Sequence, residues 1–149
     1  MAGPTGYQQH GYGYSYGAVA VSAGFWSRFG AYLIDSVLLA LPTQLLFAIA
    51  PDAVGVLYLL SLVIGVLYFA MLEGGPTGQT LGKKALGIRV VDMNTYQPGI
   101  GLGRGIGRYF ARWLSALPLA LGYFWMIWDK EKQCWHDKLV NDRVVKVNP

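Results

Sequence analysis

Residues 53–72 read AVGVLYLLSLVIGVLYFAML, and this stretch decides the class of the protein. It holds 20 residues and no charged side chain. A helix rises about 1.5 Å per residue, so a stretch of this length crosses the hydrocarbon core of a bilayer, which is ~30 Å thick. The stretch therefore predicts a membrane-spanning helix.

A second apolar stretch comes just before it, over about residues 25–50. Trp26 and Tyr32 lie near its start, where amphipathic aromatic rings prefer the membrane interface. Pro51 and Asp52 then predict a tight turn. Because the connection is so short, the two stretches are expected to form a helical hairpin of two antiparallel membrane helices.

The composition agrees with a membrane protein. Of 149 residues, 54% are apolar and 13% are charged, whereas soluble domains carry about 25% charged residues. The net charge of +4 comes from basic residues that flank the apolar segments, and this distribution argues against nucleic-acid binding. A single cysteine, Cys134, excludes an internal disulfide and a cysteine-cluster metal site. We expect no enzyme activity, no metal and no cofactor.

Residues 1–24 form a segment rich in Gly, Tyr and Gln, with no side chain of fixed charge. Such a segment cannot bury a core, so its composition predicts a disordered tail. Its tyrosines are either weak interaction sites or simply solvated. Residues 25–147 are expected to form one membrane domain.

After the hairpin the sequence predicts short cytoplasmic elements. Thr80 is a suitable cap for a helix over 81–86. Residues 88–91 and 143–147 are rich in Val and Ile and predict strands that pair outside the membrane. A turn after Asp92 is expected to lead to a further short strand near Tyr96.

The third apolar segment, about 104–128, is less regular. Arg104, Arg108 and Arg112 recur every four residues and so form one stripe on a helix. Only the 16 residues of 113–128 lack charge, and they reach about 24 Å, short of a full crossing. Pro118 and Gly122 are expected to interrupt them further. Basic residues place both flanks of this segment in the cytoplasm: Lys83, Lys84, Arg89 and Arg104 before it, and Lys130, Lys132, Lys138, Arg143 and Lys146 after it. This favours an interfacial helix that becomes re-entrant; the alternative is a third span with an external C-terminus.

Three blocks of sequence are similar to the signature blocks of the RDD family of small integral membrane proteins. They are WSRFGAYLIDSVLL (26–39), GGPTGQTLGKKALGIRVVD (74–92) and WHDKLVNDRVVKV (135–147). The family is named after one arginine and two aspartates, which the resemblance matches to Arg28, Asp35 and Asp137. It implies a membrane domain suspected of transporting an unidentified ligand, with some members associated with sodium/proton exchange. The tail is similar in composition to those of actinobacterial members.

Arg28 and Asp35 are seven residues apart, which brings them to one helix face but about 10.5 Å apart along the axis. Each therefore needs another partner. We expect Asp35 to pair with Arg108 or Arg112, because a carboxylate inside a membrane must be sheltered by protein or water. For Arg28 the expected partner is either Glu73, near the cytoplasmic end of the second span, or Asp137. Two interpretations stay open, an ion or proton site and a structural clamp. The candidate site residues are Arg28, Asp35, Glu73, Arg108, Arg112 and Asp137.

Two further expectations concern assembly. Gly101-xxx-Gly105 and Gly103-xxx-Gly107 have the spacing that permits close helix approach, although glycines here also fit a flexible linker. Two or three helices cannot enclose a pathway alone. The sequence thus predicts a multi-pass protein of the inner (plasma) membrane that forms a homo-oligomer or joins a larger membrane partner, as a transport component or as a scaffold.

Overall fold

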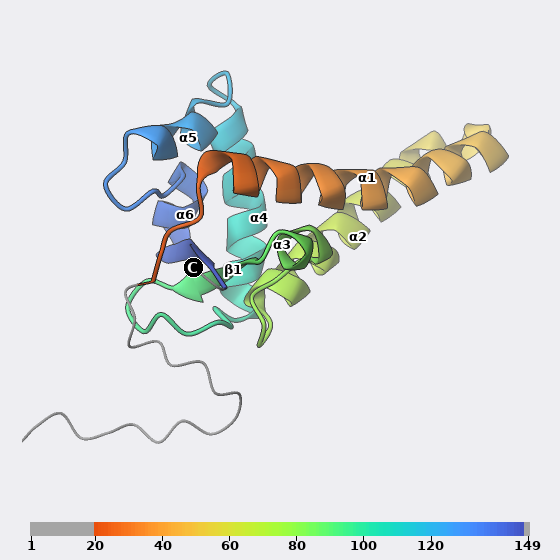
Figure 1. The fold of residues 1–149 in the computed structure, drawn as a ribbon. Coiled ribbons are helices and arrows are strands. Elements are labelled where there is room, and N and C mark those ends of the chain that lie inside the picture. Colours follow the sequence, from red (N-terminus) through yellow and green to blue (C-terminus); the bar gives the residue numbers. More distant parts are fainter. Residues whose placement is uncertain (1–19, 148–149) are drawn as a thin grey trace, which may run out of the picture.

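Two long helices dominate the fold. In a computed structural model, which describes residues 20–147, α1 spans Phe25–Ile49 and α2 spans Val54–Gly74, joined by the 3-10 turn η1 at Pro51–Ala53. Both helices are long and apolar enough to cross a membrane. They project together away from the other elements (Figure 1). The two predicted spans are therefore confirmed as candidate membrane helices.

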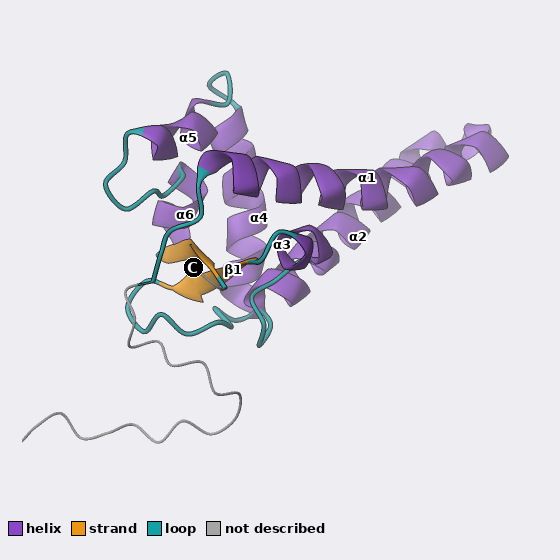
Figure 2. Cartoon of the chain, viewed as in Figure 1, coloured by secondary structure: helices purple, strands orange, loops and turns teal. Residues whose placement is uncertain are grey.

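The remaining elements gather at the end of the molecule where α1 begins and α2 ends (Figure 2). They comprise short helices, one longer helix and two strands. In chain order they are α3 (Leu81–Ala85), β1 (Ile88–Asp92), α4 (Leu102–Ala116), α5 (Leu121–Phe124), η2 (Trp125–Ile127), α6 (Trp135–Val140) and β2 (Asp142–Lys146).

The two strands form a small antiparallel sheet in which Val90 lies opposite Val144. The predicted pairing of these segments is confirmed. The chain just before α1 joins the same sheet, because Ser22 forms a bridge with Val145 and the amide of Ala23 donates to the carbonyl of Val144 at 2.9 Å. The start of α1, the segment after α2 and the end of the chain thus lie together. Residues 20–24, expected to belong to the disordered tail, are part of this structure, while residues 1–19 lie outside the described residues.

The strand expected near Tyr96 does not form. Asp92 Oδ1 accepts hydrogen bonds from the amides of Asn94 and Thr95, which closes a turn. Tyr96 then has a φ of +55°, in the left-handed region that a strand cannot use. After this turn, one isolated antiparallel bridge forms between Val91 and Pro98.

The third apolar segment is broken into two arms. The axis of α4 and that of the α5–η2 arm differ by 107°. The break occupies residues 117–120, around Pro118, where Leu119 and Ala120 both have positive φ. The arms pack closely, since a Cβ on Gly122 would stand 2.6 Å from Cα of Ser115. The interruption predicted by Pro118 and Gly122 is present, and it takes the form of a sharp bend.

Helix α4 packs against α2 through a glycine. A Cβ on Gly105 would stand 2.6 Å from the carbonyl oxygen of Ala70, whereas a Cβ on Gly103 would meet nothing within 4 Å. The expected close approach is therefore made by Gly105. It brings the arginine stripe of α4 up against the end of α2, where Glu73 lies.

Candidate functional site

Arg108 is the centre of a buried network of ion pairs. Its side chain is 2% exposed. Its Nε donates to Oε2 of Glu73 at 2.9 Å, and its Nη1 forms ion pairs with Asp137, at 2.5 Å, and with Asp142. One guanidinium on α4 thereby links α2, α6 and β2. Three buried carboxylates around one arginine meet the requirement that a buried charge be paired.

Glu73 collects the other cations of the network. It is fully buried and accepts Lys83 from α3 and Arg112 from α4, in addition to Arg108. Arg112 also stacks over the ring of Phe69, with 4.5 Å between the guanidinium carbon and the ring centroid. Glu73 thus ties the end of α2 to two other elements.

Arg28 pairs with Asp137, one of its two expected partners. Its Nη2 also donates to the carbonyl of Lys132 at 2.7 Å. Asp137 in turn accepts the amide of Cys134 at 2.9 Å, which caps the start of α6. From the sequence, either Glu73 or Asp137 could be the partner of Arg28. In the structure Glu73 instead forms ion pairs with Lys83 of α3 and with the two arginines of α4.

The network pushes the pKa values of two neighbouring carboxyls apart. Burial opposes ionisation of Asp137, but the guanidiniums of Arg108 and Arg28 outweigh it and hold its pKa well below the ordinary value. Burial raises the pKa of Asp142 to about 7, with a further contribution from the charge of Asp137. Burial also lowers the pKa of Lys83 to about 8, against the pull of Glu73. Asp142 is therefore the carboxyl of the network that holds a proton most readily.

Asp35 lies outside this network, and its expected pairing with Arg108 or Arg112 is wrong. Its carboxylate is 1% exposed. Oδ1 accepts the Tyr68 hydroxyl at 2.7 Å and the Gly82 amide at 2.8 Å, and Oδ2 accepts the Thr80 hydroxyl at 2.5 Å. All three donors are uncharged. Among residues 20–147, no ion pair reaches Asp35.

The reason lies in the segment around α3, which folds back on α1. Thr80 caps α3 as predicted, accepting the amide of Lys83 at 3.3 Å while donating to Asp35. Gly82 lies so close to α1 that a Cβ there would overlap the carbonyl oxygen of Ala31. Only glycine permits this approach, which presents its amide to Asp35. The arginines of α4 are meanwhile held by Glu73, Asp137 and Asp142.

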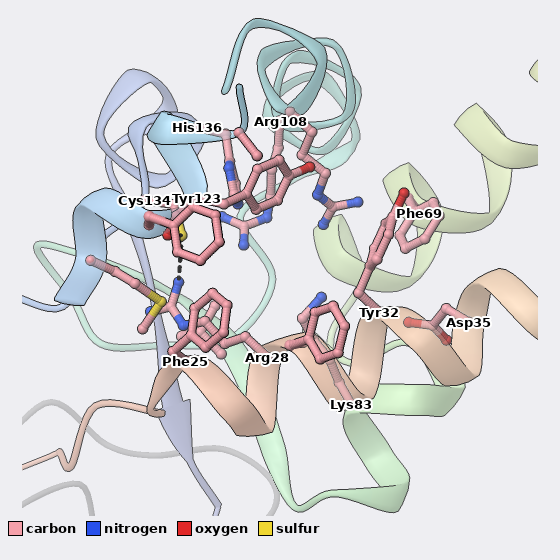
Figure 3. A pocket seen from close by; sticks show the side chains of 16 residues that line it. Phe25, Arg28, Tyr32, Asp35, Phe69, Lys83, Arg108, Tyr123, Cys134 and His136 are labelled. Carbon is pink, nitrogen blue, oxygen red and sulfur yellow. Dashed lines mark hydrogen bonds between the residues drawn. The ribbon is translucent and has the colours of Figure 1, made fainter. Parts of the chain in front are cut away.

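A cavity of about 240 Å³ extends from the ion-pair network around Arg108 to the carboxylate of Asp35. Figure 3 shows Arg28 and Lys83 on one side of it, Arg108 and His136 across from them, and Asp35 at the end away from Cys134. Aromatic rings form much of its wall, among them Phe25, Phe29, Tyr32, Phe69, Tyr123 and Phe124. The cavity is thus both aromatic and cationic.

Cys134, His136 and Asp137 bring potential metal-ligand atoms within 4.8 Å of one another. Their surroundings do not suit a cation. Arg28 and Arg108 both pair with Asp137, and burial raises the pKa of the Cys134 thiol to about 12, so that it stays protonated. Nδ1 of His136 lies 3.2 Å from the hydroxyl of Ser115. These contacts fit a packed structural cluster.

Sequence reasoning missed four residues of the two sites: Tyr68, Thr80, Lys83 and Asp142. Thr80 was identified only as a helix cap, and Lys83 only as a mark of orientation. Tyr68 lies four residues before Leu72, the end of the apolar stretch of α2, and resembles an ordinary interfacial tyrosine. No pattern in the sequence connects these residues to Asp35 or Glu73, since the connection depends on the fold of the 75–87 segment.

Comparison with known proteins gives a family and three named relatives. The model of the RDD family matches residues 22–141. The chain is 36% identical to the uncharacterized protein YxaI of Bacillus subtilis (strain 168), over 83% of this chain and 96% of that one. It is 32% identical to a proline-rich antigen homolog of Mycobacterium tuberculosis, over 65% of this chain and 42% of that protein. It is also 32% identical to the proline-rich antigen of Mycobacterium leprae, over 44% of this chain and 26% of that protein.

The match to the mycobacterial antigens spans less than half of their length. No solved structure matches the chain. The matched family region contains Arg28, Asp35 and Asp137, the three residues that the structure places in the ion-pair network and in the separate carboxylate site.

Proposed function

Because this chain belongs to the RDD family of membrane-type proteins, we propose that it is a component of a membrane transport system in which Asp35 takes up and releases a proton in exchange for a cation. The supporting observation is the environment of Asp35. It is a buried carboxylate in a candidate membrane helix, with three uncharged donors and no cationic partner among the described residues.

The uncharged surroundings of Asp35 are compatible with proton binding, which a permanent arginine partner would oppose. A carboxylate held permanently by arginine is a poor proton carrier, because the guanidinium favours the ionised form. Asp35 has no such partner, while the arginines nearby are taken up by other acids. Ionisable groups inside a membrane are otherwise costly and mark pathways for ions or protons.

A groove beside Asp35 supplies a route along the hairpin. It has a volume of about 910 Å³ and runs between α1 and α2 as far as α4. Hydroxyl and amide side chains line it, namely Ser36, Thr43, Gln44, Ser61, Tyr58 and Tyr109. Arg112, Phe69 and Tyr32 line both this groove and the cationic cavity. In a membrane the polar side chains of this groove need a cover, so we propose that a second copy of the chain provides it.

The pairing of the two strands supports the proposed topology. Because β1 pairs with β2, we propose that the segments before and after the third apolar segment lie on one side of the membrane. Together with the 107° bend, this favours a re-entrant third segment. Basic residues in the 73–104 loop favour the cytoplasmic face of the plasma membrane for that side and for both termini.

Proton flux in liposomes tests the proposal. The full chain is reconstituted with a pH-sensitive dye inside, and proton movement is followed after an inward sodium or potassium gradient is applied. We expect cation-dependent flux from the wild type, loss of flux in Asp35→Asn, and wild-type flux in Asp52→Asn. The control removes an exposed carboxylate from η1. Equal flux in Asp35→Asn and wild type, at equal incorporation, would contradict it.

The ion-pair network supports a second candidate function, a membrane scaffold or accessory subunit. Arg28, Glu73, Arg108, Arg112 and Asp137 form ion pairs with one another and join four elements, α1, α2, α4 and α6, as a structural clamp requires. A scaffold predicts no flux under any cation gradient and a stable stoichiometric complex with another membrane protein. The flux measurement therefore discriminates between the two functions.

A further inference from the structure

The charges around the 240 Å³ cavity are arranged with the cations inward. Four basic side chains line it: Arg28, Lys83, Arg108 and Arg112. The acids that pair with them, Glu73, Asp137 and Asp142, are not among the lining residues. Asp35 is the one carboxylate in the lining described. The cavity therefore presents positive charge to whatever enters it, and its low-dielectric walls strengthen the attraction for an anion.

One donor in this lining is unused. Nη1 of Arg112 is buried and has no hydrogen-bond partner among residues 20–147, and the whole residue is 7% exposed. A buried donor without a partner destabilises the folded protein, and more so when it carries charge. Buried polar groups of native proteins are otherwise almost always paired. An anionic oxygen in the cavity would satisfy this atom.

The rest of the wall is apolar. Phe25 and Phe124 stack with 5.3 Å between their centroids, and Phe29 stacks on Phe25 at 6.0 Å. Phe29 is 49% exposed, so the aromatic wall continues to the surface of the protein. The volume also exceeds that of an apolar cavity of about 150 Å³, which holds a benzene ring. There is room for a small ionic head and the first part of an apolar chain.

An exposed tryptophan beside the cavity indicates the level in the membrane at which the cavity lies. Trp26, whose ring contacts the lining residues Phe25 and Phe29, is 78% exposed. Exposed tryptophans at the end of a membrane helix prefer the level of the lipid headgroups. The cavity thus opens where the ionised heads and apolar chains of amphiphiles meet.

We propose that this cavity binds the phosphate or carboxylate head of an anionic amphiphile, with Arg112 and Lys83 on the head and the Phe25–Phe29–Phe124 wall along the chain. This binding site does not depend on proton exchange at Asp35. A protein without proton flux can bind the amphiphile, and a protein with flux can fail to bind it.

Equilibrium binding of radiolabelled dodecyl phosphate to the purified full chain in a maltoside detergent tests the proposal. Dodecylphosphocholine keeps the chain and adds a trimethylammonium group, while inorganic phosphate keeps the head and removes the chain. We expect saturable binding of dodecyl phosphate, with competition at least 10-fold weaker from either of the other compounds. Competition by inorganic phosphate as strong as by unlabelled dodecyl phosphate would overturn the amphiphile assignment.

Neighbouring lysines provide a matched pair of variants. Lys83 lines the cavity, whereas Lys84 is exposed and does not. Lys83→Gln and Arg112→Gln should each weaken binding at least 10-fold, and Lys84→Gln should leave it unchanged. Equal binding by Lys83→Gln and Lys84→Gln would overturn the proposal.

Two further variants keep the test independent of the ion-pair network. Phe29→Ala shortens the aromatic wall and removes no charge, so it should weaken dodecyl phosphate binding several-fold. Asp35→Asn removes the carboxylate from the lining and should strengthen binding. Weaker binding by a folded Asp35→Asn, or unchanged binding by Phe29→Ala, would contradict the placement of the head and chain.

Discussion

Arg28 at the start of α1 and Asp137 in α6 form a partly buried ion pair across 109 positions of sequence. Asp137 shares Arg108 with Glu73 and Asp142, so the pair connects the first membrane helix to the end of the chain. The resemblance matches both residues, together with Asp35, to the arginine and the two aspartates after which the family is named, and Asp35 lies in a different environment. The three residues therefore divide between two environments, an ion-pair network and a carboxylate with uncharged donors.

Removal of the shared carboxylate should destabilise the protein strongly. Asp137→Asn leaves Arg28 and Arg108 without one of their charged partners in a buried place, and breaking a buried pair in this way costs about 3–5 kcal/mol. Thermal unfolding in detergent measures the loss. Asp129→Asn removes the partner of Lys138, whose side chain is 44% exposed, and should cost about 1 kcal/mol or less. Equal losses in the two variants would contradict the clamp.

Asp142 should make stability depend on pH. Its pKa is about 7 in the folded protein against an ordinary value of 3.8, so the folded state binds the proton more tightly. The contribution to stability is complete below about pH 4 and is lost as the pH rises through about 7. Between pH 5 and pH 8 the unfolding temperature of the wild type should fall relative to that of Asp142→Asn.

Comparison with Asp142→Asn is needed because another group acts in the opposite direction. Burial lowers the pKa of His136 well below its ordinary value, so its effect favours the folded state as the pH rises through 6.5. Parallel curves for wild type and variant would contradict the raised pKa of Asp142.

Two glycines of α4 should respond oppositely to the same substitution. Gly105→Ala places a Cβ 2.6 Å from the carbonyl oxygen of Ala70 and forces α4 away from α2. Separation of packed elements should cost a few kcal/mol. Gly103→Ala meets no atom within 4 Å and should stabilise the helix by roughly 0.5–1 kcal/mol. Thermal unfolding of both variants measures the difference; a harmless Gly105→Ala would contradict the packing of α4 on α2.

Cysteine labelling in intact cells should report the proposed topology. In a Cys134→Ser background, Asp52→Cys should react with a membrane-impermeant maleimide from outside. Lys84→Cys and Lys130→Cys should react only after the membrane is opened. Lys130 follows the third apolar segment, so external labelling of Lys130→Cys would overturn the re-entrant arrangement.

Much of the fold was predictable because its signals are local. Apolar runs predicted the hairpin, Thr80 predicted the start of α3, and β-rich segments predicted the strand pairing. The spacing of Arg28 and Asp35 also showed that they could not contact each other. The prediction of a strand near Tyr96 was wrong, because the side chain of Asp92 accepts hydrogen bonds that close a turn there.

The partners of Asp35 were not predictable in this way. A cation was the expected shelter for a carboxylate inside a membrane, yet an amide and two hydroxyls supply it. The decisive residue is Gly82, whose missing side chain lets α3 approach α1. Competition among the acids for the arginines is likewise a property of the whole fold, since Glu73, Asp137 and Asp142 come from three elements.

Labelling with dicyclohexylcarbodiimide, an apolar reagent that attacks protonated carboxyl groups, tests the central claim that Asp35 exchanges a proton. The protein is treated in lipid bilayers and the modified peptides are identified by mass spectrometry. We predict modification of Asp35 that is absent from Asp35→Asn, with Glu73 and Asp137 unmodified because arginines hold them ionised. Modification of Glu73 or Asp137 in a folded protein whose Asp35 stays unreactive would contradict the account.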